Sequence, residues 1–358
     1  MLALFISLFS LLVFAVTPVD VIPARATACV PDDPDDPAIY VHPTDPGRSL
    51  VLGTNKVPAP GGALVVFDLD GKIRQTVANL DRPNNVDVEY GLQLGTGTAD
   101  IAVVTERLKK RLRVFRIGPD GMLTDVGAET GLNVFEGREG EASAPMGIAL
   151  YKRSRDGAIF AVVAPKTGAS EGYLSQYRLL DDGAGRVKAQ KVRDFGRFSG
   201  VGEIEAVAVD DDLGYVYYAD EGNGIHKYHA DPDHPQAGVE LAHFGRDGFK
   251  LDREGIAIFA CQDGTGYVVC TDQIEGNSEY HVYRREGTPG NPHDHSEVLK
   301  IVRGGADETD GLEITSAPLG TAFPHGLMVA MNSGPRNFLF FRWEDVASAG
   351  TVKLRTSR

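Results

Sequence analysis

Three short patterns recur in the same order six times along this chain. The first is a polar residue that opens an alternating strand, and the second is an apolar run that ends in polar residues. The third places an aromatic residue just before a polar turn, at intervals of about 50 to 60 residues: Phe67, Phe115, Tyr177, Tyr228, Tyr283 and Phe341. Since no segment shows sustained helical periodicity, these patterns predict repeated units built from β-strands.

The repeats also predict the architecture. Connecting sequence such as DLDGKIRQTV, residues 68–77, supplies a fourth strand to most units. Six units of about 50 residues with about four strands each are typical of a six-bladed β-propeller, so the predicted fold class is all-β. The terminal FLFFRW, residues 338–343, is expected to pair with strands from the other end of the chain and close the ring.

The N-terminal segment differs from the repeats. Residues 2–16 are apolar, which is the right length for the core of a signal peptide, and Ala26 to Ala28 form a small-x-small cleavage site. We therefore predict a signal peptide over residues 1–28, one propeller domain over 29–350 and a C-terminal tail over 351–358. The protein is expected to be secreted or periplasmic, with no membrane association after signal removal. Lipidation of Cys29 is left open. Cys261 and Cys270 are expected to be two small buried hydrophobic residues, with a disulfide between them as the less favoured alternative.

The first strand of each propeller blade lines the central channel, so the residues that open these strands should form a ring at one mouth. They are Asp35 and Asp36, Asn84 and Asn85, Met146, Glu205, Asp252 with Glu254, and Asp310. The polar ends of the next strands should reach the same mouth and add Lys56, Arg107, Lys166, Glu221, Gln273 and Asn332. Any one of these residues is more often a turn cap, but recurrence at equivalent positions favours a shared site, and packing explains Met146 best.

Several carboxylates at one mouth raise each other's pKa unless they bind cations. Carboxylate and amide oxygens suit Ca²⁺ best, and the nine histidines show no zinc-like spacing. Basic residues at the same rim would face an anion, so metals and cations together indicate phosphoryl transfer. The formal charge of −14 argues against nucleic acid as a partner.

Several stretches resemble one known family. DDPAIYVHP, SLVLGTNK, NNVDVEYGL, DREGIAIF, DGTGYVV, TDGLEITSAPLG and FPHGLMVA resemble the β-propeller phytases, calcium-dependent enzymes that hydrolyse myo-inositol hexakisphosphate. The resemblance runs from about Asp32 to Ala347. It implies a six-bladed propeller in which several Ca²⁺ ions shield carboxylates, bind substrate phosphates and activate a water. It further implies calcium phytate as the substrate of a protein expected to be a monomer.

The resemblance also implies roles for individual residues. The expected catalytic residues are Lys56, Arg107, Glu205 and Glu254, and the expected substrate-binding residues are Lys56, Arg107 and Lys166. The expected calcium ligands are Asp35, Glu205, Glu221, Asp252, Glu254 and Asp310, with Asp36 on a structural ion.

The phosphate-contacting positions depart from the family pattern at Val57, Met146 and Thr167. Two alternatives therefore remain open at this point. One is a propeller that binds calcium and an anion without turnover, and the other is a calcium-dependent lactonase or esterase on the same fold.

Overall fold

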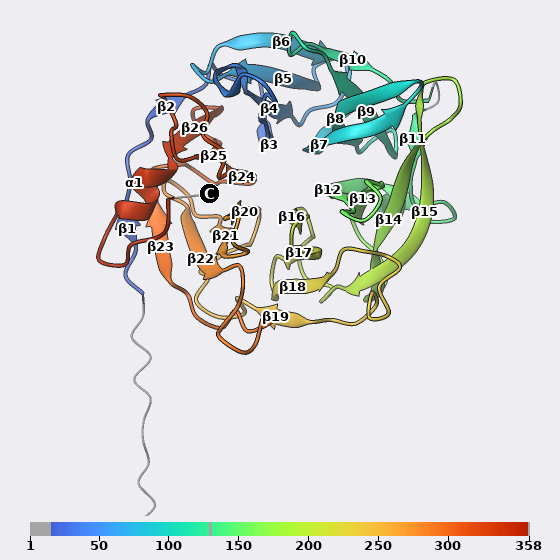
Figure 1. Cartoon of the computed structure of the whole chain (residues 1–358). Helices are drawn as coiled ribbons and strands as arrows, with labels where there is room; N and C mark the ends of the chain where they lie inside the picture. Colours follow the sequence, from blue (N-terminus) through green and yellow to red (C-terminus); the bar gives the residue numbers. More distant parts are fainter. Residues whose placement is uncertain (1–15, 129–130, 357–358) are drawn as a thin grey trace, which may run out of the picture.

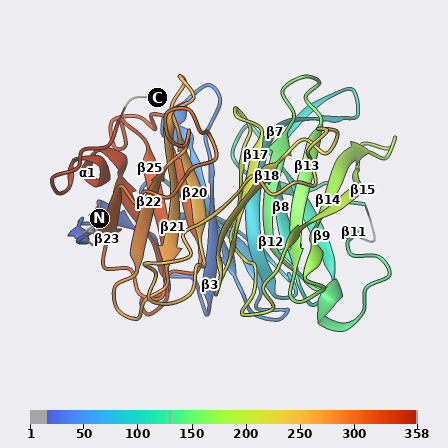
Figure 2. The same ribbon diagram turned by 90° about the horizontal axis from the view of Figure 1, so that it is seen from below.

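The computed structural model describes residues 16–128 and 131–356, and they form six β-sheets arranged in a ring (Figure 1). The sheets follow each other in chain order and are numbered here as blades one to six. Figure 2, at right angles, shows the strands running along the channel axis. The predicted all-β, six-bladed propeller is confirmed.

The three patterns of the sequence correspond to the first three strands of each blade. The innermost strands are β3 (Pro34–Tyr40), β7 (Pro83–Leu94), β12 (Pro145–Lys152), β16 (Val207–Asp210), β20 (Ile256–Ala260) and β24 (Leu312–Thr315). The second strands are β4 (Leu50–Asn55), β8 (Gly97–Glu106), β13 (Ile159–Pro165), β17 (Tyr215–Asp220), β21 (Gly266–Asp272) and β25 (Leu327–Asn332). The third strands carry the recurring aromatic residues and are β5 (Ala63–Asp68), β9 (Arg111–Ile117), β14 (Glu171–Asp181), β18 (Gly224–His229), β22 (Glu279–Arg284) and β26 (Asn337–Arg342).

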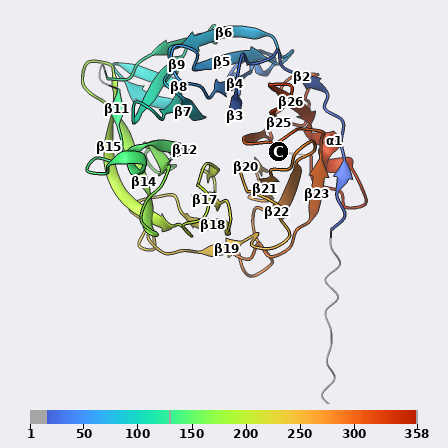
Figure 3. The same ribbon diagram turned by 180° about the vertical axis from the view of Figure 1, so that it is seen from behind.

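The outer strands vary more than the inner ones. They are β6 (Ile73–Ala78), β10 (Leu123–Asp125) with β11 (Leu132–Asn133), β15 (Val187–Arg197), β19 (Ala242–Phe244) and β23 (Lys300–Arg303). One short α-helix, α1 (Trp343–Ser348), and two 3₁₀ turns, Pro46–Arg48 and Gly140–Ser143, complete the described elements. Figure 3, from behind, shows α1 at the outer edge of the ring beside β23. None of the helices in the described ranges has the length and apolar character that crossing a membrane requires.

The two ends of the chain close the ring. Strand β2 (Arg25–Ala26) pairs antiparallel with β26, so the fourth strand of blade six comes from the N-terminal end. Strand β1 (Val19–Asp20) adds a fifth strand to blade five by pairing parallel with β23. This confirms the predicted closure, which removes an exposed sheet edge.

The folded unit is longer than the predicted domain of residues 29–350. Both β1 and β2 precede residue 29, so cleavage after Ala28 would remove two strands of the sheets. At the other end Leu354 is buried, and the carbonyl of Arg355 accepts a hydrogen bond from Trp343 Nε1 at 2.8 Å. Residues 351–356 therefore pack on the domain. The apolar core of the predicted signal peptide lies almost wholly in residues 1–15, outside the described residues.

Six hydrophobic clusters stabilise the ring, one at each contact between neighbouring blades. Strands such as β4 and β25 are buried along their whole length because each sheet packs against a neighbour on both faces. Cys261 and Cys270 are buried, unpaired members of two of these clusters, as predicted.

Candidate active site at the channel mouth

The first strands bring carboxylates from several blades to one mouth of the channel. Lys56 Nζ lies 2.6 Å from Asp35 Oδ1 and 3.3 Å from Asp310 Oδ2, which joins blades one and six. Asn84 Nδ2 donates to Glu205 Oε2 at 2.9 Å and to Asp35 Oδ2 at 3.3 Å. These contacts connect residues up to 254 positions apart, so the predicted convergence is present.

Two glycines allow the blades to approach closely at this mouth. A Cβ on Gly147 would lie 2.2 Å from the carbonyl oxygen of Glu205, and one on Gly311 would lie 2.6 Å from that of Asp35. Larger side chains would push these backbones apart. Gly147 of the MGIALY stretch therefore lets the neighbouring blade bring in Glu205. Gly311 of the TDG stretch likewise lets the neighbouring blade bring in Asp35.

The ends of the second strands have two separate functions. The last strand residue accepts backbone N–H groups from the loop entering the blade: Asn55 from Asp32 and Asp33, Glu106 from Asp81, Asp220 from Ser199, Asp272 from Lys250 and Leu251, and Asn332 from Asp307. Asn332 is thus one of the residues that bind a loop backbone. Its predicted place among the residues at the mouth was wrong, because the mouth residues of the other blades come one position later in the chain. The next residue of the chain is the one that reaches the mouth: Lys56, Arg107, Lys166, Glu221 and Gln273.

The acidic side of the mouth is formed by blades four to six. Carboxylate oxygens of Glu221, Asp252 and Glu254 lie within 4.8 Å of one another. Burial and the neighbouring Glu205 raise the pKa of Glu221 to about 8. Burial is also the main cause that raises the pKa of the other shifted acids at the mouth, which are Asp35, Glu254 and Asp310.

These buried acids lie close together with few cations beside them, so they are under-neutralised when ionised. Lys56 is the cation in direct contact with Asp35 and Asp310, and the carboxylates raise its pKa although burial alone would lower it. One ammonium group cannot compensate a set of this size. Oxygen donors alone, close together and short of positive charge, fit Ca²⁺, which takes six to eight oxygen ligands.

The basic side of the mouth is formed by blades one to three, where Arg107 and Lys166 occupy the positions equivalent to Lys56. Arg107 Nη1 donates to Asn84 Oδ1 at 3.5 Å, and Lys166 forms an ion pair with Glu203. Burial lowers the pKa of Arg107 and of Lys166, and each also feels the positive charge of another basic side chain nearby. The positive charges of Arg107 and Lys166 are only partly balanced by nearby carboxylates, and both side chains are half-buried at the rim. Such side chains are suited to bind an anion.

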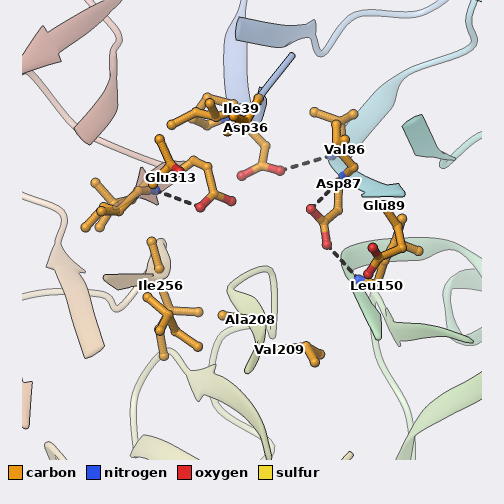
Figure 4. A pocket seen from close by; sticks show the side chains of 18 of the residues that line it. Asp36, Ile39, Val86, Asp87, Glu89, Leu150, Ala208, Val209, Ile256 and Glu313 are labelled. Carbon is orange, nitrogen blue, oxygen red and sulfur yellow. Dashed lines mark hydrogen bonds between the residues drawn. The ribbon is translucent and has the colours of Figure 1, made fainter. Parts of the chain in front are cut away.

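The adjacent residues Asp35 and Asp36 serve two different places. Asp36 Oδ2 accepts the backbone N–H of Val86 at 3.0 Å and lines the channel interior, a cavity of about 650 Å³ (Figure 4). Asp87 and Glu313 face the same cavity, where burial raises the pKa of Asp87 to about 7. The register of β3 against β4 is irregular between Pro34 and Pro37, and within this irregular stretch Asp35 reaches the mouth while Asp36 lies in the channel.

Some contacts of the mouth were not predicted. Asn84 connects Asp35 with Glu205, Glu203 pairs with Lys166, and Gln273 Nε2 donates to Asp310. Asn84 and Gln273 stood at predicted ring positions, so repeat alignment indicated their place but not their partners. Met146 is fully buried, in agreement with a packing role.

The family model and one curated relative point to the same family. The model of the phytase family matches residues 11–352. A 3-phytase of Bacillus subtilis (strain 168) is 32% identical over 334 residues, which are 88% of this chain and 81% of that protein. Among solved structures, the Cps50 (Swd1) beta-propeller domain of Myceliophteria thermophila covers 85% of this chain and 82% of that chain, with a TM-score of 0.46 and 14% identity. The family match runs through all six blades.

Proposed function

This chain belongs to the phytase family, and we propose that it is a calcium-dependent phosphoric monoester hydrolase that acts on myo-inositol hexakisphosphate. The observation that carries the proposal is the channel mouth, where under-neutralised carboxylates stand opposite basic side chains. A substrate that carries many phosphates, presented as its calcium salt, matches both sides of such a mouth.

The calcium ligands proposed at the mouth are the carboxylates already brought together there: Asp35, Glu205, Glu221, Asp252, Glu254 and Asp310. Asp36, inside the channel, would hold a separate structural ion. Calcium at the mouth would offset the carboxylate and phosphate charges and polarise a water molecule for attack on phosphorus.

The side chains of the chain itself would bind and orient the substrate. Lys56 and Arg107 would donate hydrogen bonds to the phosphate that is cleaved. They would stabilise the negative charge on the phosphoryl group while it is transferred to water. Lys166 lies on the next blade and would hold a neighbouring phosphate. Asn84 positions Glu205 and Asp35 through its amide group, at 2.9 Å and 3.3 Å.

The test is phosphate release from calcium phytate near neutral pH, with and without a chelator. We expect release that chelation abolishes and that added calcium restores. Calcium-dependent binding of phytate without release would instead support a binding propeller, and hydrolysis of esters or lactones but not of phytate would support the remaining alternative.

We also propose that the protein is exported as a monomer and that its leader is removed before Val19. The support for that position is the pairing of β1 and β2 within blades five and six. Mass spectrometry of the exported protein should show a mature chain that retains residues 19–28, and a mature chain beginning at Cys29 would contradict the proposal. Size-exclusion chromatography with light scattering tests the monomer.

A further inference from the structure

A second group of ligand-type side chains lies in blade five, and none of its members was among the predicted site residues. It consists of Asp272 at the end of β21 and of Glu279 and His281 on β22. Asp272 pairs directly with Glu279 in the antiparallel register, and His281 follows two residues later. Since side chains repeat every second residue on one face of a sheet, all three lie on the same face. One ligand atom of each lies within 4.8 Å of the others.

The histidine of this group is buried and lacks partners. His281 is 0% exposed, and neither ring nitrogen has a hydrogen-bond partner among the described residues. Its Nε2 faces Asp272 Oδ2 at 3.9 Å, too long for a hydrogen bond. The ring of Phe249 stacks on it at 4.1 Å and fixes its plane. Leaving a buried polar group unpaired is costly, so an ion between the nitrogen and the two carboxylates would relieve this cost.

We propose that Asp272, Glu279 and His281 bind a divalent transition-metal ion of the zinc class. Imidazole nitrogen and carboxylate oxygen are both ligands of Zn²⁺, and three protein ligands leave a position for water. Calcium fits poorly, because it needs six to eight oxygen ligands and avoids imidazole. Because neither ring nitrogen of His281 has a hydrogen-bond partner among the described residues, a nitrogen lone pair is free to bind the ion.

Lys250 controls access to this site. Its ammonium lies 2.7 Å from Glu279 Oε1, and its side chain is 59% exposed, so it can swing into solvent when a metal ion takes its place. The backbone N–H groups of Lys250 and Leu251 donate to the two oxygens of Asp272, both at 2.8 Å. A bound ion would therefore fasten the loop that presents Asp252 to the channel mouth.

Blade four supplies an internal comparison. His226 is equivalent to His281, and its Nε2 also lies 3.9 Å from the equivalent carboxylate, Asp220. Its Nδ1, however, is paired with Glu240 at 2.8 Å, and the residue opposite Asp220 in the register is Gly224. His226 therefore has a partner, and this blade lacks the counterpart of Glu279.

His226, Glu240 and His243 are also close enough to one another to be compared with the proposed site. The rings of His226 and His243 are stacked at 4.2 Å with an interplanar angle of 13°. Nitrogen lone pairs in parallel planes do not converge on one ion. His243 Nε2 is moreover occupied by the carbonyl of Asn223 at 3.0 Å.

The experiment is a zinc titration of the full calcium-saturated protein by calorimetry, with excess calcium blocking the mouth carboxylates. We expect one zinc site whose affinity falls at least about tenfold in His281→Gln and in Glu279→Gln and is unchanged in His226→Gln. Lys250→Met should strengthen zinc binding, because the competing ammonium is gone. Circular dichroism of each variant confirms that it is folded.

X-ray absorption at the zinc edge supplies a second readout that does not depend on the variants, and it should show mixed nitrogen and oxygen ligation. No zinc binding in excess calcium would overturn the proposal. Binding that survives in folded His281→Gln, or that is lost in His226→Gln, would overturn it too. All of these outcomes are independent of phytate hydrolysis, so they separate this inference from the proposed function.

Discussion

The two halves of the channel mouth carry opposite charges at equivalent positions. The residue after the second strand is basic in blades one to three, at Lys56, Arg107 and Lys166, and is acidic or neutral in blades four and five, at Glu221 and Gln273. The second strand of each of these blades ends just before this residue, so the difference in charge lies in the side chains. The same repeated strand end thus carries basic side chains on one half of the mouth and an acidic or an amide side chain on the other.

The halves also differ in how well their charges are compensated. Lys56 contacts two carboxylates and Lys166 contacts Glu203, whereas the group of Glu221, Asp252 and Glu254 has like charges close together. The acidic half needs an added cation to be stable when ionised. We therefore expect changes on the acidic half to affect activity most and changes on the basic half to affect substrate affinity.

The largest effect is expected for Glu205→Gln, which removes a charge at the centre of the acidic half without changing volume. Activity on calcium phytate should fall on the order of 100-fold, the range seen when groups supporting a bound metal are lost. The melting temperature should change little, because the amide keeps the contact with Asn84. Glu171→Gln, at an exposed ion pair on blade three, is the control. Full activity in Glu205→Gln would refute the shared role of the mouth carboxylates.

A smaller effect is expected for Lys56→Met on the basic half. We expect kcat/KM to fall about tenfold, since one cation that faces the cleaved phosphate is lost. Lys109→Met removes an exposed lysine paired with Asp81 and should have no effect. Equal activity of the two variants would show that Lys56 only balances Asp35 and Asp310.

Lys166→Met tests the outer part of the basic half. Its ion pair with Glu203 already offsets part of its charge, so the expected result is a rise in KM of about threefold with kcat unchanged. Steady-state kinetics on phytate measures both constants. A fall in kcat as large as that of Lys56→Met would move Lys166 to the cleavage position.

The pH dependence of stability provides the mildest test. Without calcium, the raised pKa values of Asp35, Glu221, Glu254 and Asp310 mean that the folded state holds protons that the unfolded state has released. The melting temperature should then fall by several degrees as the pH rises from about 4.5 to about 8, the pKa of Glu221. Calcium should remove this slope by binding the ionised carboxylates. A slope that calcium leaves unchanged would place the titrating acids elsewhere.

Much of the mouth could be predicted from the sequence because the fold is a repeat. Each blade forms the same strands, so residues such as Glu205 and Asp310 could be assigned to one ring by counting positions within their own repeats. The same counting misplaced Asn332 by one residue, since a polar strand end does not reveal whether it holds a loop or faces the channel. Ion pairs such as that of Lys166 with Glu203 depend on how side chains of neighbouring blades meet. A local sequence pattern does not contain this information.

The sequence by itself determined the number of blades, the order of their strands and the crowding of carboxylates at one end, because these follow from local periodicity. The sequence indicated that the last strand pairs with the other end of the chain, but only the tertiary structure decided that β2 is its partner and that β1 joins blade five, since pairing over some 300 residues leaves no local signal. It also decided that His281 meets Asp272 and Glu279 without a hydrogen-bond partner. The nine histidines are scattered along the chain, so their spacing does not single out His281. Its burial in the folded protein, without a hydrogen-bond partner among the described residues, makes it a candidate metal ligand.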